Sequence, residues 1–93
     1  MSRLSVEGKA RPGGWTYTVR VADAGGATEH AVDVSEAYAR KLGGGSPPDD
    51  LVRRSFEFLL ARESKESILR RFELPAIGRY FPDYEAAMKR HAA

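Results

Sequence analysis

The chain has 93 residues and a formal net charge of +2, and its balance of 42% hydrophobic and 30% charged residues is typical of a folded domain rather than a disordered chain. It contains no cysteine, which excludes a disulfide-stapled scaffold and a zinc site built on thiolates. No apolar run is long enough to cross a membrane, and the first residues lack the apolar core of a secretory signal. We therefore expect one domain, residues 1–93, in the cytoplasm and without a membrane partner.

Residues 1–34 carry strand patterns. Leu4 and Val6 alternate with polar neighbours, and the turn residues 11–14 end this first strand. The clearest alternation of apolar with polar residues follows, at Trp15, Tyr17, Val19 and Val21. Glycines at the next turn permit a hairpin, and residues 30–34 alternate again in a returning strand. This half of the chain predicts a three-stranded antiparallel β-meander with one buried face.

Residues 35–93 carry helix patterns. Ser35 can cap a helix over 36–42, which basic residues and Gly43 end. Residues 43–48, rich in glycine and proline, predict a flexible internal loop. The main helix then starts at Pro48, with its apolar stripe at Leu51, Val52, Phe56, Leu59 and Leu60.

The rest of the chain predicts shorter helices. Ser64 can cap a helix over 65–72, Pro75 restarts the chain, and Pro82 separates a short helix from a last one. The predicted fold is α+β, in which three to four helices cover one face of the meander.

Residues 65–84 have the outline of a degenerate helix-turn-helix. In that interpretation, the residues that could contact nucleic acid are Lys65, Arg70, Arg71 and Arg79. Glu73 in the turn, Pro82 soon after the second helix begins, and a nearly balanced charge in both halves of the chain count against it. Acidic residues four positions before several arginines are more typical of a solvated helix surface. A nucleic-acid-binding regulator is therefore the alternative hypothesis.

The same segment is rich in large apolar residues, most of which should pack in the core. A chain of this length does not bury every such group, and exposed Tyr, Phe and Arg side chains are typical anchors of protein contacts. We therefore predict a partner-contact patch at Arg79, Tyr80 and Phe81. The predicted partner is another protein or a second copy of the chain in a homodimer.

No pattern in the sequence indicates catalysis or a cofactor. The serines lack a nucleophile-elbow motif, and the glycine-rich loop lacks the Lys-Ser/Thr ending of a phosphate loop. His30 is in phase with Val32 and Val34, which favours a hydrogen-bonded structural role over a catalytic one. We predict no catalytic, cofactor-binding or metal-binding residues, and hence a protein that is not an enzyme.

The segment LVRRSFEFLLARESKESILRRFELPAIGRYFPDYE, residues 51–85, resembles a family of small uncharacterised bacterial proteins with a β-rich front and a helical back. Its FEFLL and RYFP stretches are the most specific parts of this resemblance. The resemblance implies a bacterial source and brings no activity, cofactor or catalytic residue. Together with the residue patterns, it leads us to expect a small interaction or regulatory module.

Overall fold

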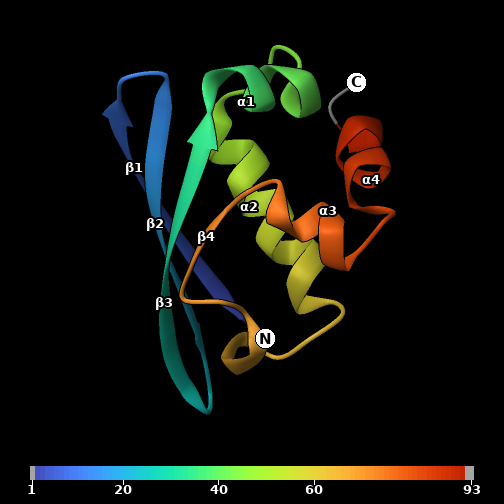
Figure 1. Cartoon of the computed structure of the whole chain (residues 1–93). Coiled ribbons are helices and arrows are strands. Elements are labelled where there is room, and N and C mark those ends of the chain that lie inside the picture. The colour runs from blue at the N-terminus through green and yellow to red at the C-terminus, as the bar shows by residue number, and fades with distance from the viewer. Residues whose placement is uncertain (1, 92–93) are drawn as a thin grey trace.

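The structure, a computed structural model, describes residues 2–91 and contains a four-stranded sheet with helices on one side (Figure 1). The strands are β1 (Arg3–Arg11), β2 (Gly14–Asp23), β3 (Gly26–Ser35) and β4 (Arg71–Glu73), in the order β1-β2-β3-β4. The first three pair antiparallel, which confirms the meander, and β4 adds to β3 in parallel. The α+β fold class is confirmed, with one strand more than the sequence predicted.

The helical layer comes from the second half of the chain. It comprises α1 (Glu36–Gly43), α2 (Pro48–Leu60), the 3₁₀ turn η1 (Lys65–Ser67), α3 (Ala76–Tyr80) and α4 (Tyr84–His91). Ser35 caps α1 as expected, since its Oγ accepts a hydrogen bond from the Tyr38 amide at 3.1 Å. The predicted loop at 43–48 is shorter than expected, because α1 includes Gly43 and α2 includes Pro48. Within residues 2–91, none of these helices has the length and apolarity needed to cross a membrane.

The strand register sorts the two faces of the sheet. Tyr17 pairs with Val32 and Val19 pairs with His30, and all four side chains are buried beneath the helices. The aromatic residues of β2, Trp15 and Tyr17, therefore belong to the packed face of the sheet. Phe56 of α2 is fully buried against this face, so the main helix covers the sheet as its apolar stripe predicted.

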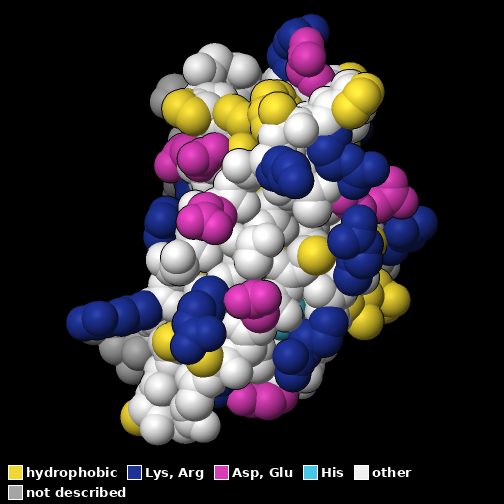
Figure 2. All heavy atoms as spheres, turned by 90° about the vertical axis from the view of Figure 1, so that its left-hand side faces the viewer, with side chains coloured by type: hydrophobic (Ala, Val, Ile, Leu, Met, Phe, Trp, Pro, Cys, Tyr) yellow, Lys and Arg dark blue, Asp and Glu magenta, His cyan; other side chains and the backbone are white. Residues whose placement is uncertain are grey.

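Among residues 2–91, no helix covers the opposite face of the sheet (Figure 1). Threonines and charged residues point from the strands toward this side, and Figure 2 shows Lys and Arg interspersed with Asp and Glu across it. Asp33 lies within this face and forms ion pairs with Arg11 and Arg71, each at 3.1 Å. The face is thus a mixed, internally paired polar surface rather than a patch of one charge.

The predicted helix over 65–72 is wrong. Its residues form the single turn η1 and then the strand β4, which lies along the outer edge of β3 (Figure 1). Backbone bonds fix this strand at both ends, from the Ala31 amide to the Arg70 carbonyl at 2.8 Å and from the Leu74 amide to the Asp33 carbonyl at 3.0 Å. An edge strand has backbone groups that need partners, and satisfying them outweighs the weak helical periodicity of this short segment.

Candidate functional site

The three residues predicted to contact a partner lie at the end of α3 and just beyond it, in different environments. Tyr80 keeps 69% of its surface exposed, and Arg79 is exposed beside it. Phe81 is half-buried, because its ring packs edge-on against Phe58 of α2 with the ring centroids 5.9 Å apart. Tyr80 is thus available to a partner, whereas Phe81 mainly joins α3 to the main helix.

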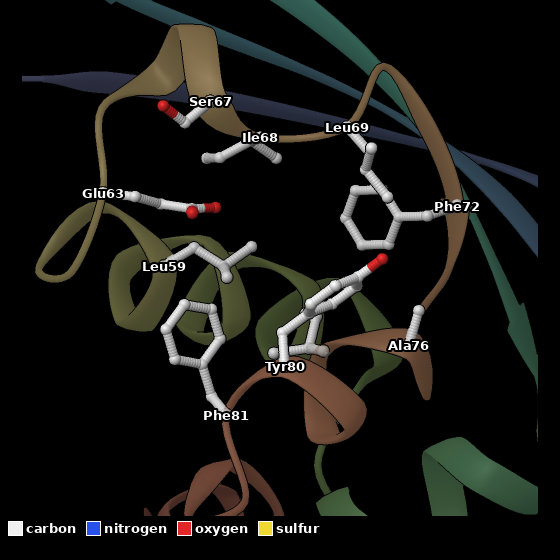
Figure 3. A pocket seen from close by; sticks show the side chains of 10 residues that line it. Leu59, Glu63, Ser67, Ile68, Leu69, Phe72, Ala76, Tyr80 and Phe81 are labelled. Carbon is white, nitrogen blue, oxygen red and sulfur yellow. The ribbon is translucent and has the colours of Figure 1, made fainter.

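Tyr80 forms one wall of a hollow of about 350 Å³ between α2, α3 and the segment that leads into β4 (Figure 3). The hollow is predominantly apolar, and the residues that line it are Leu59, Glu63, Ser67, Ile68, Leu69, Phe72, Ala76, Ile77, Tyr80 and Phe81. Its floor is core, since Leu59, Ile68 and Ile77 are each almost fully buried. The hollow is therefore an opening onto the core rather than a separate cavity.

Leu69 stands at the rim of this hollow with 51% of its surface exposed. Its backbone is held from inside the sheet, because the Leu69 carbonyl accepts a hydrogen bond from His30 Nδ1 at 2.8 Å. His30 Nε2 lies 2.8 Å from the Thr28 hydroxyl, so both ring nitrogens have a hydrogen-bond partner. His30 thus has the hydrogen-bonded structural role that the sequence predicted. Its bond to the Leu69 carbonyl holds the backbone from which the Leu69 side chain extends into solvent.

Glu63 supplies the charge at the other end of the hollow. Its amide bonds the Leu59 carbonyl at 2.8 Å just after α2 ends, which places the side chain over the opening (Figure 3). The ion pairs among residues 2–91 do not include Glu63. The neighbouring Arg62 is engaged elsewhere, because it pairs with Asp83 at 3.0 Å and lies 3.5 Å above the Phe58 ring. The hollow thus combines apolar walls with one half-buried carboxylate that has no cation partner in the described structure.

The residues of the nucleic-acid alternative do not form a basic surface of the predicted kind. The helix that should carry Lys65, Arg70 and Arg71 is absent, as described above. Lys65 is only 6% exposed, and its Nζ bonds the Asp23 carboxylate at 2.8 Å and 3.0 Å. Those hydrogen bonds raise the pKa of Lys65 and lower that of Asp23.

Lys65 therefore joins η1 to the β2–β3 turn and cannot reach a phosphate. Arg71 is exposed but paired with Asp33, while Arg70 and Arg79 are exposed on different segments. A helix-turn-helix over 65–84 is contradicted by this geometry.

Several polar side chains of the described residues are held in contacts within the fold. Among the described residues, no cluster of three or more His, Asp or Glu side chains is placed to hold a metal ion. Ser55 donates to the Leu51 carbonyl at 2.7 Å and lies 2.6 Å from the Tyr84 hydroxyl, which makes it a buried structural bridge. Asp33 and Trp15 line a second, more polar hollow. The Asp33 carboxylate there is already paired with Arg11 and Arg71.

Comparisons with protein-family models, curated proteins and solved structures gave no significant match to this chain. The site must therefore be interpreted from its own geometry. Of the residues that line the hollow, the sequence analysis singles out Tyr80 and Phe81 and not Leu69 or Glu63. Leu69 lies in the segment for which the sequence predicts a helix, where the structure has η1 and β4. Nothing in the sequence distinguishes Glu63 from the other acids; only the fold brings it to the hollow.

Proposed function

We propose that this protein is a small, non-enzymatic interaction module that binds a protein segment in the hollow between Leu69 and Tyr80. One observation carries the proposal: among the described residues, Leu69 and Tyr80 are the large hydrophobic side chains that remain exposed, and both line the same hollow. Exposed apolar groups around a concave site are typical of docking surfaces. In line with the resemblance of residues 51–85, we propose that the module acts in the bacterial cytoplasm.

The chemistry of the hollow indicates what the bound segment contains. A large apolar side chain would lose its contact with water on entering between Leu69, Phe72 and Tyr80, which is worth about 1.5–3 kcal/mol per side chain. A lysine or arginine close to that anchor would meet Glu63, whose carboxylate has no cation within the described structure. The proposed ligand is therefore a segment with an apolar anchor next to a basic residue.

A selection from random peptides displayed on phage tests this proposal. We expect the selected peptides to share a Leu, Ile, Phe or Trp followed or preceded closely by Lys or Arg. Their affinity for Leu69→Ser and Tyr80→Ser should fall about tenfold or more, the range expected for anchor contacts. Arg40→Gln, an exposed change on α1 far along the chain from the hollow, serves as the control and should bind like the wild type.

Glu63→Gln tests the charge separately from the apolar contact. This variant should bind the peptides that carry the basic residue more weakly than the wild type does. Its affinity for the same peptides with that residue replaced by glutamine should equal that of the wild type. Selected peptides that lack an apolar anchor, or that bind Leu69→Ser and Tyr80→Ser as tightly as the wild type, would contradict the proposal. Thermal unfolding of each variant establishes that lost binding is not lost folding.

A further inference from the structure

The strand β1 ends the sheet with one side of its backbone open. β1 pairs with β2 on one side and stands at one end of the strand order, so among the described residues no strand lies on its other side. Residues 3–11 contain no proline and form an uninterrupted ladder with β2. Long, regular edge strands of this kind are templates for pairing with another strand.

The helical layer also leaves β1 incompletely covered. On the helix side of the sheet, the apolar residues at the centre of β2 and β3 are buried, whereas Leu4 and Val6 are only half-buried. Gly8 and Ala10, which continue this face of β1, are exposed. A neighbour that continued the sheet past β1 would therefore remove further apolar surface from water.

One contact limits which part of the edge is open. Arg53 of α2 donates a hydrogen bond from its Nη1 to the Leu4 carbonyl at 3.2 Å. A strand that paired with the start of β1 would have to compete with this guanidinium. Residues 5–11, beyond Leu4, carry no such contact from a helix side chain within the described structure.

We propose that residues 5–11 pair antiparallel with the same residues of a second copy, with the two-fold axis at Gly8. In this register Glu7 lies opposite Lys9 of the second copy, and Lys9 opposite its Glu7, on the polar face of the sheet. Val6 lies opposite Ala10 on the helix side. The pairing is self-complementary in charge and in polarity, and it extends the sheet across both copies.

Neighbouring registers are less favourable. An axis at Glu7 places Glu7 opposite itself and Arg3 opposite Arg11. An axis at Lys9 matches Glu7 with Arg11 but places Lys9 opposite itself. An axis at Val6 brings Arg3 against Lys9. An axis at Ser5 matches Arg3 with Glu7 but pairs only the first residues of β1, where Arg53 occupies the Leu4 carbonyl. Like charges directly opposite each other destabilise a strand pair, so Gly8 is the favoured centre.

Charge reversal tests the register directly. The wild type should be dimeric by sedimentation equilibrium at low salt, and Glu7→Lys or Lys9→Glu alone should raise the dimer dissociation constant about tenfold or more, because each places like charges at two symmetric positions. Mixing the two variants should restore a dimer, since positions 7 and 9 would both be basic in one chain and both acidic in the other. When one of the two variants is labelled with ¹⁵N, native mass spectrometry distinguishes this mixed dimer from both homodimers by its mass.

Two results would overturn the inference. Either a wild type that stays monomeric at high concentration, or single variants that dimerise as well as the wild type, excludes this edge and register. Arg40→Glu on α1 is the matched control, because it reverses an exposed charge away from β1 and should not change the dissociation constant. The inference is independent of the hollow at Tyr80, whose variants should dimerise normally.

Discussion

Phe56 lies where the main helix meets the sheet, and its surroundings explain why one residue can matter to the whole core. Its side chain is fully buried, with ring centroids 5.4 Å from His30 of β3 and 6.1 Å from Phe72 of β4. We expect Phe56→Ala to lower the free energy of unfolding by about 3–5 kcal/mol, because it removes buried contacts and leaves a cavity that these elements cannot close. Urea unfolding followed by circular dichroism measures the loss.

Tyr80→Ala is the matched aromatic control for this prediction. Because Tyr80 is 69% exposed, its removal should change stability by no more than about 0.5 kcal/mol, as is usual for surface positions. A loss of less than about 1 kcal/mol for Phe56→Ala would mean that α2 does not pack on the sheet as described, and a large loss for Tyr80→Ala would remove it from the proposed binding surface. The sequence analysis places Phe56 in the apolar stripe of the main helix and Tyr80 in an exposed patch, and the burial of the two side chains agrees with this difference.

At the scale of elements, the sequence pattern predicted the helices and strands that depend on residues close together in the chain. The alternation in β2 and β3 and the serine cap of α1 depend on near neighbours in sequence, and the structure confirms them. β4 depends instead on hydrogen bonds to the backbone of β3, far earlier in the chain. The sequence near β4 does not show this pairing, and the apolar spacing from Ile68 to Phe72 indicated a helix. Leu69 and Glu63 reach the hollow only through this unpredicted strand and the loop before it.

Gly14 provides a test of how tightly β2 and β3 are joined. It pairs with Ser35, and a Cβ added to Gly14 would clash with the Val34 carbonyl oxygen. Gly14→Ala should therefore cost about 1–3 kcal/mol, the usual penalty for forcing extra volume into a packed site, because backbone rather than a mobile side chain must move. Thermal unfolding gives the comparison.

Gly45→Ala is the control for the effect on stability of replacing a glycine by alanine at a site without a clash. A Cβ at Gly45 would meet nothing within 4 Å, so this change should leave stability nearly unaltered. Equal unfolding temperatures for both variants would show that the end of the β2–β3 ladder is looser than the register implies.

At the scale of the whole molecule, tyrosine hydroxyl groups join the layers. Tyr17 of β2 donates to Asp49 of α2 at 2.6 Å, and Tyr38 of α1 donates to Glu85 of α4 at 2.7 Å. Tyr84 of α4 lies 2.6 Å from the Ser55 hydroxyl of α2. Burial is the main reason that the pKa of each of these tyrosines is raised above its usual value, and the acceptor carboxylates of Tyr17 and Tyr38 add to it.

The raised pKa values predict that the folded state becomes less stable in alkali. A tyrosine in the unfolded chain has a pKa of about 10, so below that pH both states hold the proton and the contribution to stability is complete. Above it the unfolded chain releases protons that the folded chain retains, and stability falls as pH rises. For the fully buried Tyr84, the loss should be roughly 1.4 kcal/mol for each pH unit above 10.

Tyr84→Phe separates the effect of Tyr84 ionisation on stability from the effect of lysine titration. The variant and the wild type have the same lysines, so only the tyrosine contribution differs between them. At neutral pH the variant should be less stable by about 1 kcal/mol, because its hydrogen bond with Ser55 is gone. Above about pH 10 the gap should shrink and then reverse, since phenylalanine has no proton to lose. Urea unfolding at a series of pH values measures both parts, with the exposed Tyr80→Phe as control. Parallel stability curves for Tyr84→Phe and the wild type across this range would mean that the Tyr84 hydroxyl ionises in the folded state as easily as in water, and that α4 is not closed over it.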